Sequence, residues 1–368
     1  CVYIKGHLFG EMDGFVFNLS GADSVLENKK LMQVVRPFLR QHLTRLVTSF
    51  YEAPESEILL RVNGQVIWRG SKIGQLEKTQ KILNPKVKLI KSDELDKSSL
   101  EKIQRKLDIF IENRVKTLMP NLLSLANDNK LRGGAAGFAH IFVNNLGVLM
   151  KSEVMEQFNS IDNESKAKLK NFGIRFGYKT IYDTTLLKPE ASRLRIALFN
   201  VFRAIPEPTL FHPPAGLVTV EYDKHISKKQ YLVAGFFVAG NRAIRIDMLE
   251  RLFFMIKEYS KDEWIVIQPA MLSITGLGLE KFTELIRSLR FDIKHEKIEK
   301  GNEGITFEKD DEHYKVLFKK QNINKSVKIM AASETFKKTK QNRKKNRVKK
   351  QMPTNDSPFS LLKVLIKN

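Results

Sequence analysis

The side chains with the clearest chemical potential in this chain are cations gathered near its C-terminus. Positions 337–350 hold nine lysines and arginines in fourteen residues and no acidic residue. They are Lys337, Lys338, Lys340, Arg343, Lys344, Lys345, Arg347, Lys349 and Lys350. Such a run repels itself, cannot build a core, and attracts polyanions by releasing their condensed counterions. It predicts a disordered basic segment over 331–355 that binds nucleic acid. The alternative is a solubilising tail without specific affinity.

Two further groups of cations are candidates for contact with a phosphate backbone. The first group is Arg175, Lys188, Arg193 and Arg195. These residues either line an RNA path or form structural ion pairs. The second group is Lys281, Arg287 and Arg290, which fall on one predicted helix. Two glutamates, Glu280 and Glu284, share that helix face and weaken its positive field.

The motifs of several enzyme classes are absent from the sequence. A P-loop needs a second glycine and a following helix to cradle phosphates, and the stretch 69–72 has neither. The acidic stretch 93–96 is better explained as the cap of a helix than as a magnesium-binding box. The seven histidines lack metal-ligand spacing, and the single cysteine is Cys1. We therefore predict no catalytic residue, no metal site and no cofactor in this chain.

Length and charge limit the remaining possibilities. The chain has 368 residues and a net charge of +22, so it still carries +13 when the nine charges at 337–350 are set aside. This length predicts two or three domains. No apolar stretch approaches the roughly 18 residues of a membrane span, and no signal peptide is recognisable. We expect a cytoplasmic protein with no membrane partner. Because the sequence starts at Cys1 in a strand-like pattern, we interpret it as a fragment that lacks an upstream portion.

The sequence pattern around these cations predicts helices and strands that together form an α+β fold, predominantly helical. Residues 1–92 are expected to form an α+β domain. It contains a strand hairpin over 2–19 and a helix over 25–52, which has apolar residues at helical spacing. A second hairpin turns at Asn63-Gly64, a pair that suits a type I′ turn, and a strand is expected at 86–90.

The middle of the chain is predicted to be a helical domain over 93–205. Pro120 is expected to interrupt the helical pattern, and Gly173 and Gly177 to break it again. Prolines and a glycine then crowd the stretch 206–216, which indicates a domain boundary.

The last folded part, 206–330, is predicted to resemble a winged helix. A strand is expected at 231–238, followed by three helices over 243–259, 269–276 and 279–290. Two strands, 304–308 and 314–318, complete the pattern. Three helices followed by a hairpin is the order of a winged helix, whose third helix lies on nucleic acid. The alternative is a winged helix that serves only for packing against protein.

The final segment, 356–368, is apolar and follows the charged stretch. Phe359, Leu362 and Ile366 fall on one helical face. We expect these three residues to form a short helix that docks on a protein partner, with a frayed terminal helix as the alternative.

Several ordered motifs together resemble one protein family. They are Gly6 to Phe17, Ile67 to Gly70, Gly173 to Gly177, Leu186 to Pro189, Pro213 to Leu217, Ala243 to Arg251 and Asp356 to Phe359. In this order they are similar to the C-terminal region of alphaproteobacterial superfamily-two helicases, relatives of the mitochondrial degradosome RNA helicase. The resemblance covers nearly the whole chain.

The resemblance implies an accessory region of an ATP-dependent helicase that acts on RNA more than on DNA. In such a parent protein the ATPase motor lies upstream, so ATP and magnesium belong to the motor and not to these residues. The competing interpretation is a protein-interaction scaffold that recruits a nuclease or ribosomal partner through residues 356–368.

Overall fold

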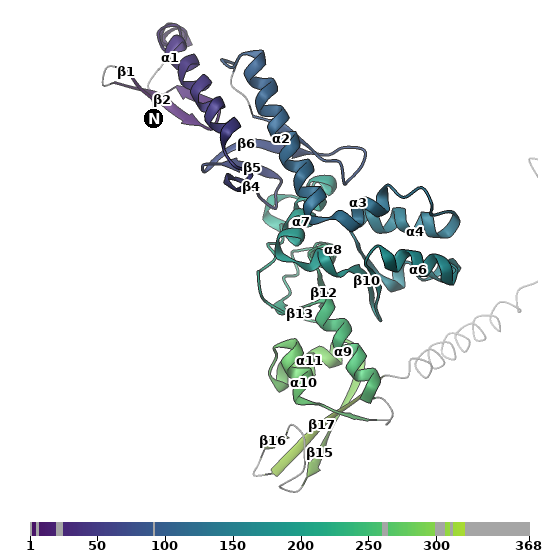
Figure 1. Ribbon diagram of the computed structural model, residues 1–368. Helices are drawn as coiled ribbons and strands as arrows, with labels where there is room; N and C mark the ends of the chain where they lie inside the picture. Colours follow the sequence, from purple (N-terminus) through teal and green to yellow (C-terminus); the bar gives the residue numbers. More distant parts are fainter. Residues whose placement is uncertain are drawn as a thin grey trace, which may run out of the picture. The chain divides into compact units, whose positions relative to one another are not determined.

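The computed structural model describes residues 2–4, 7–19, 25–90, 93–259, 264–298, 306–309 and 312–320 (Figure 1). Helices and several small antiparallel sheets alternate along the chain, so the predicted α+β class is confirmed. By internal contacts, the described residues up to Lys319 belong to one compact unit. The predicted basic segment 331–355, with its nine cations, and the docking segment 356–368 lie outside the described residues.

The N-terminal part contains the two predicted hairpins. Strands β1 (Val2–Ile4), β2 (His7–Asp13) and β3 (Val16–Leu19) form one sheet, and helix α1 (Val25–Glu52) follows. The 3₁₀ helix η1 (Glu55–Glu57) leads into a second sheet. Its strands are β4 (Ile58–Leu60), β5 (Gln65–Trp68), β6 (Ser71–Glu77) and β7 (Lys86–Leu89), paired in that order.

A lysine from the next helix closes the C-terminal end of α1. Lys106 lies on α2 (Lys97–Leu118), and its Nζ donates to the carbonyl oxygens of Phe50 and Tyr51 at 2.7 Å each and to that of Ala53. These carbonyls belong to the last turn of α1 and its exit, where a helix leaves acceptors without partners.

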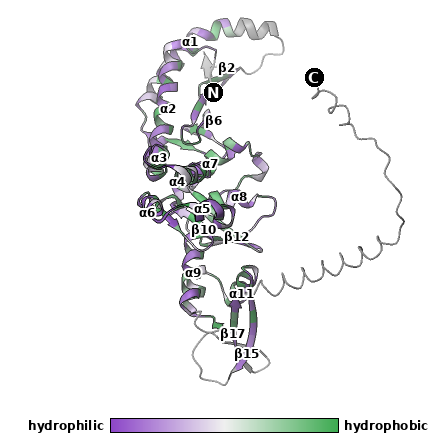
Figure 2. Cartoon of the chain, turned by 90° about the vertical axis from the view of Figure 1, so that its right-hand side faces the viewer, coloured by the Kyte–Doolittle hydropathy of each residue, from purple (hydrophilic) through white to green (hydrophobic). Residues whose placement is uncertain are grey.

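The amphipathic pattern of α1 and α2 is visible in Figure 2 as alternating hydrophilic and hydrophobic residues.

In the middle part, helices begin at the positions that the sequence predicted: one after Asp96 and one at Pro120. Asp96 caps α2 by accepting from the backbone N–H of Ser99 at 3.1 Å. Pro120 begins a new helix, α3 (Pro120–Ala126), and α4 (Gly133–Asn144) follows. The capping interpretation of residues 93–96 is therefore confirmed.

The predicted break in the helical pattern at Gly173 and Gly177 is present, but it contains strands that were not predicted. Helices α5 (Met155–Ser160) and α6 (Asn163–Asn171) are followed by strands β9 (Ile174–Phe176) and β10 (Thr180–Asp183) before α7 (Pro189–Arg203). These strands join β8 (Val148–Met150) in a sheet of order β8-β10-β9. Two further 3₁₀ helices, η2 (Lys151–Glu153) and η3 (Thr184–Leu187), flank this region. Strands of three or four residues are too short for periodicity to reveal.

The predicted strand over 231–238 is also wrong in its first half. After η4 (Glu207–Thr209) and β11 (Thr219–Glu221), helix α8 (Lys228–Val233) precedes β12 (Phe236–Ala239). Gly235 separates them with a φ of +95°, a conformation that favours glycine. Strand β13 (Arg242–Arg245) pairs with both β11 and β12.

The C-terminal part of the described chain has three helices and one sheet. The helices are α9 (Ile246–Tyr259), α10 (Pro269–Thr275) and α11 (Leu279–Ser288), close to their predicted bounds. The strands are β14 (Ile265–Val266), β15 (Phe291–Ile298), β16 (Thr306–Lys309) and β17 (Glu312–Lys320), with order β14-β17-β15 and β16 paired to β17. Strands β14 and β15 were not predicted. The helices pack on one face of this sheet (Figure 1).

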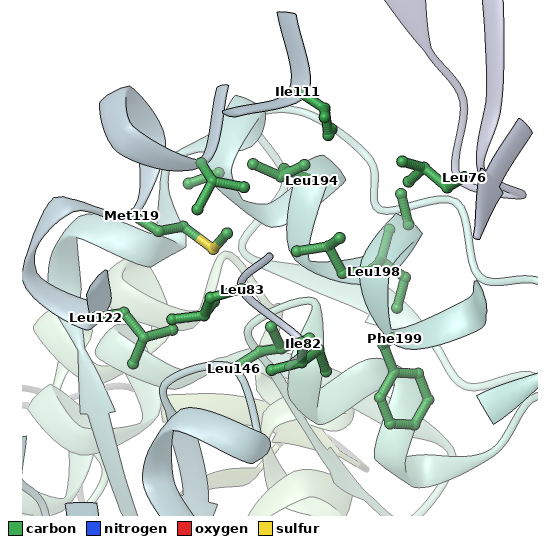
Figure 3. Packing of buried hydrophobic residues seen from close by; sticks show 14 of the residues in the cluster. Leu76, Ile82, Leu83, Ile111, Met119, Leu122, Leu146, Leu194, Leu198 and Phe199 are labelled. Carbon is green, nitrogen blue, oxygen red and sulfur yellow. The ribbon is translucent and has the colours of Figure 1, made fainter. Parts of the chain in front are cut away.

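Two apolar clusters form the interior. The first extends in sequence from Phe15 to Ile246, and the second from Ala239 to Phe318. Figure 3 shows part of the first cluster, in which Leu76, Met119 and Leu198 come from β6, the end of α2 and α7. The first cluster contains residues on both sides of positions 92 and 205, so no break in the hydrophobic core marks the domain boundaries predicted there. These boundaries stay predictions.

Candidate nucleic-acid interface

Arg195 is a structural residue, which corrects its predicted role in nucleic-acid binding. It is 1% exposed, and its Nε and Nη1 donate to the carbonyl oxygens of Leu146 at 2.7 Å and Leu186 at 3.0 Å. Burial lowers the pKa of the guanidinium, and the nearby buried carboxylate of Asp183 opposes that shift. A side chain enclosed in this way cannot reach a phosphate at the surface.

The other predicted cations of the described chain are exposed at the surface. Arg175 lies on β9, Lys188 precedes α7, Arg193 lies on α7, Lys281 and Arg287 lie on α11, and Arg290 follows α11. Within the described ranges, none of these six forms an ion pair within 4 Å. Arg245, which is not one of these six, pairs with Asp247 at 2.7 Å. The six exposed cations are therefore available to an external anion.

A groove of about 640 Å³ brings Arg193 together with a second arginine that was not predicted. It is lined by Arg61 from the β4–β5 hairpin, Arg193 from α7, and Glu207 and His212 from the segment after α7. The exposed side chain of Leu59 adds an apolar edge. Neither arginine has an ion-pair partner among the described residues. We refer to this site as the Arg61–Arg193 groove.

The Asn63-Gly64 turn fixes one wall of the groove. The side-chain oxygen of Asn63 accepts from the N–H of Gln65 at 3.1 Å, and its amide donates to Glu207 at 2.8 Å. Gly64 has a φ of +81°, and a β-carbon there would lie 2.4 Å from a methyl group of Val201. Only glycine allows the turn to approach α7 this closely.

The opposite wall is tied to the same hairpin. Asn200 on α7 donates its side-chain amide to the carbonyl oxygen of Val62 at 2.9 Å. Glu207, which lines the groove, already accepts a hydrogen bond from Asn63. The described residues that line the groove include two guanidinium groups on fixed walls and a single carboxylate, an arrangement that favours an anionic ligand.

Arg287 lies in a different pocket, of about 400 Å³, between α11 and the β12–β13 turn. Arg242 and Glu284 share its lining, and Arg242 is paired with Glu221 at 3.9 Å. The field here is of mixed sign, as the glutamates of this helix predicted. Lys281 and Arg290 are not part of the pocket lining, so the predicted cations do not converge on one site.

A carboxylate on α9 connects this helix to the β9–β10 turn. Glu250 accepts hydrogen bonds from the backbone N–H groups of Tyr178, Lys179 and Thr180, the last two at 3.0 and 2.8 Å. The Thr180 hydroxyl donates to it at 2.8 Å. A β-carbon at Gly177 would lie 2.4 Å from the Glu250 carboxyl carbon, so the turn needs glycine there. We name this contact the Glu250 latch.

The latch affects a neighbouring tyrosine. Burial raises the pKa of Tyr182 to about 12, and the nearby carboxylates of Glu250 and Asp247 add to the shift. A phenol with this pKa remains neutral throughout the physiological range, and Tyr182 is a packed residue of β10.

Comparison with known proteins identifies no relative: no family model, no curated protein and no solved structure matches the chain. In the described part of the chain, no cluster of three histidine, cysteine or acidic residues is placed to hold a metal ion. No helix among those residues combines the length and apolar character needed to cross a bilayer.

Two residues that matter here were missed from the sequence. Arg61 lies beside a turn that was predicted correctly, but its approach to α7 depends on contacts between segments more than 130 residues apart. Glu250 lies in the motif Ala243 to Arg251, and no neighbouring residue in the sequence indicates its role. Gly177 gave a hint, because a glycine at that position suggests that another group approaches the backbone closely.

Proposed function

We propose that this chain is an accessory nucleic-acid-binding region of an ATP-dependent helicase, with RNA as the preferred substrate. The ordered motifs that resemble the C-terminal region of superfamily-two helicases support this proposal, and so does the net charge of +22. The ATPase motor, with ATP and magnesium, would belong to an upstream part of the parent protein. The expected location is the cytoplasm.

A winged-helix assignment of the C-terminal part is supported by its connectivity. The order α9, β14, α10, α11, β15, β16, β17 combines three helices with a sheet arranged β14-β17-β15, in which β16 pairs with β17. In this arrangement α11 occupies the place of the helix that lies on nucleic acid, and it exposes Lys281 and Arg287.

The observation that carries the proposal is the Arg61–Arg193 groove. Phosphate groups accept paired hydrogen bonds from guanidinium groups, and two arginines without ion-pair partners among the described residues lie in one concave site. The chain as a whole supplies the long-range attraction for a polyanion, and the groove supplies a place for its backbone.

Replacing both groove arginines with glutamine, as Arg61→Gln with Arg193→Gln, tests this proposal. Binding of a labelled single-stranded RNA is measured by fluorescence anisotropy over a series of salt concentrations. We expect weaker binding and a log–log salt slope shallower by about 1.4, since each phosphate contact on a single strand contributes roughly 0.7.

The matched control is Arg36→Gln, which also removes one positive charge from the surface. Arg36 is already paired with Glu94 at 3.0 Å, so its loss should change the slope by less. Equal effects per charge in control and groove variants would mean that the groove does not contact the RNA.

A protein-interaction scaffold remains the second candidate, and one observation favours it. Val34 and Phe38, one turn apart on α1, are 57% and 55% exposed, as expected of an apolar contact surface. A pull-down with and without residues 356–368 separates the candidates. Loss of protein partners with unchanged RNA affinity would favour the scaffold.

A further inference from the structure

Trp264 lies between two lysines at the sheet of the C-terminal part. The Nζ atoms of Lys294 on β15 and Lys319 on β17 lie 5.0 and 4.6 Å from the centre of a Trp264 ring. Trp264 is half-buried and belongs to neither apolar cluster. The chain's other tryptophan, Trp68, is 2% exposed and packed against Phe15 and Phe50.

The alternation of side chains places this group on the outer face of the sheet. Ile265, Phe318 and Phe291 belong to the second apolar cluster, on the face covered by α9, α10 and α11 (Figure 1). Trp264 and Lys319 are the sequence neighbours of Ile265 and Phe318, and Lys294 is three positions from Phe291. All three therefore point to the opposite face.

The strand register agrees with this placement. Ile265 pairs with Phe318 and Val266 with Leu317 in the antiparallel ladder, so Trp264 lies opposite Lys319. The same alternation places Lys315 on the outer face, together with the acidic residues Asp292 and Glu296. Lys294 is 3.9 Å from Glu296, and both side chains are more than 40% exposed, so this pair is weak and easily exchanged.

We propose that this outer face is a base-stacking site for single-stranded nucleic acid, with Trp264 as the platform. An unpaired base stacks on the indole, and the ammonium groups of Lys294 and Lys319 move from the ring to the phosphates on either side. Aromatic rings flanked by cations bind single strands in this way, and a base within a duplex cannot offer its face. The inference rests on the proposed function and adds a site and a strand type to it.

The two tryptophans make the site directly observable. A short oligouridylate is titrated into the full chain while tryptophan emission is recorded, and fluorescence anisotropy of the labelled oligonucleotide reports binding independently. Because Trp68 is enclosed in the core, stacking should quench only the Trp264 part of the emission. We expect Trp264→Phe to abolish the quenching and, because phenylalanine keeps a smaller stacking face, to weaken binding less than Trp264→Ala does.

Trp264→Ala should weaken binding about 5- to 140-fold, the range that corresponds to loss of one stacked base. The emission of Trp68 and the thermal unfolding curve show whether each variant is folded. A duplex RNA of the same length should bind without quenching.

The outcomes separate this inference from the proposed function. Binding seen by anisotropy without quenching, with Trp264→Ala as tight as the unaltered chain, would overturn the stacking site and leave the proposed function standing. Equal quenching by the duplex would overturn the single-strand assignment. Absence of any oligonucleotide binding would overturn both.

Discussion

Arg193 and Arg195 show how strongly the role of a residue depends on its side of a helix. Both are arginines of α7 and were indistinguishable as candidates from the sequence. Arg195 faces the interior and holds two carbonyl groups, whereas Arg193 faces the groove and has no ion-pair partner among the described residues. An arginine inside an apolar helix face is an exception to the usual burial pattern, so the sequence left an RNA path or a structural ion pair open for both.

Among the carboxylates of the described residues, we expect Glu250 to contribute most to the free energy of unfolding. Glu250→Ala removes the acceptor of three backbone N–H groups and a hydroxyl, and should lower the free energy of unfolding by about 2–3 kcal/mol. Urea denaturation followed by circular dichroism measures this change. It should also lower the pKa of Tyr182, since the Glu250 carboxylate contributes to raising it.

Glu258→Ala is the control for the latch because Glu258 is an exposed carboxylate on the same helix. Its effect should stay within about 0.5 kcal/mol. If both variants lose the same stability, the hydrogen bonds of the latch contribute nothing beyond the charge.

At the scale of elements, adjacent residues were enough to predict the turns and helix caps. The short strands and the groove depend on contacts between residues far apart in the sequence, and they were not predicted. The Asn63-Gly64 hairpin, the break at Pro120 and the Asp96 cap were correct because each depends on a few adjacent residues. Strands β9 and β10 were missed because their turn is held by a carboxylate 70 to 72 residues away. The same limit applies to the groove, whose two arginines come from separate segments, the β4–β5 hairpin and α7.

Helix α1 provides an element-scale prediction through its C-terminal lysine contact. Lys106→Met keeps the aliphatic stem but removes the donor to the carbonyls of Phe50 and Tyr51. We expect the free energy of unfolding to fall by about 2 kcal/mol, because helix-end carbonyls lose a charged partner. Thermal and urea unfolding curves provide the measurement.

Lys102→Met is the matched control, since Lys102 is exposed on the same helix, four residues earlier. It should leave stability nearly unchanged. A comparable loss in both variants would show that methionine on α2 is harmful in itself and that the contact with α1 is not stabilising.

At the scale of the whole molecule, positive charge is distributed and not concentrated at one site. The Arg61–Arg193 groove, the α11 surface and the outer sheet face carry cations of the described chain, and positions 337–350 add nine more. The sequence predicted this abundance, but not which cations share a concave surface. Non-specific affinity should therefore come from many weak contacts.

Removal of residues 337–350 should make the salt dependence of RNA binding markedly shallower. Nine cations on a single strand correspond to a reduction of the log–log slope by up to about six. Anisotropy titrations over a salt series measure it. A second variant with glutamine at the nine positions keeps the length of the chain, so agreement between the two variants assigns the effect to charge. An unchanged slope in both would show that this segment does not contact RNA.

The Glu250 latch has a consequence for how this chain can evolve. A side chain at Gly177 would collide with the carboxylate, and a shorter residue at 250 would leave the N–H groups of the turn without their acceptor. Neither position can drift alone without a penalty. Among descendants of a common ancestral chain, glycine at 177 and glutamate at 250 should be inherited together or replaced together, which makes this pair a better mark of kinship than either residue by itself.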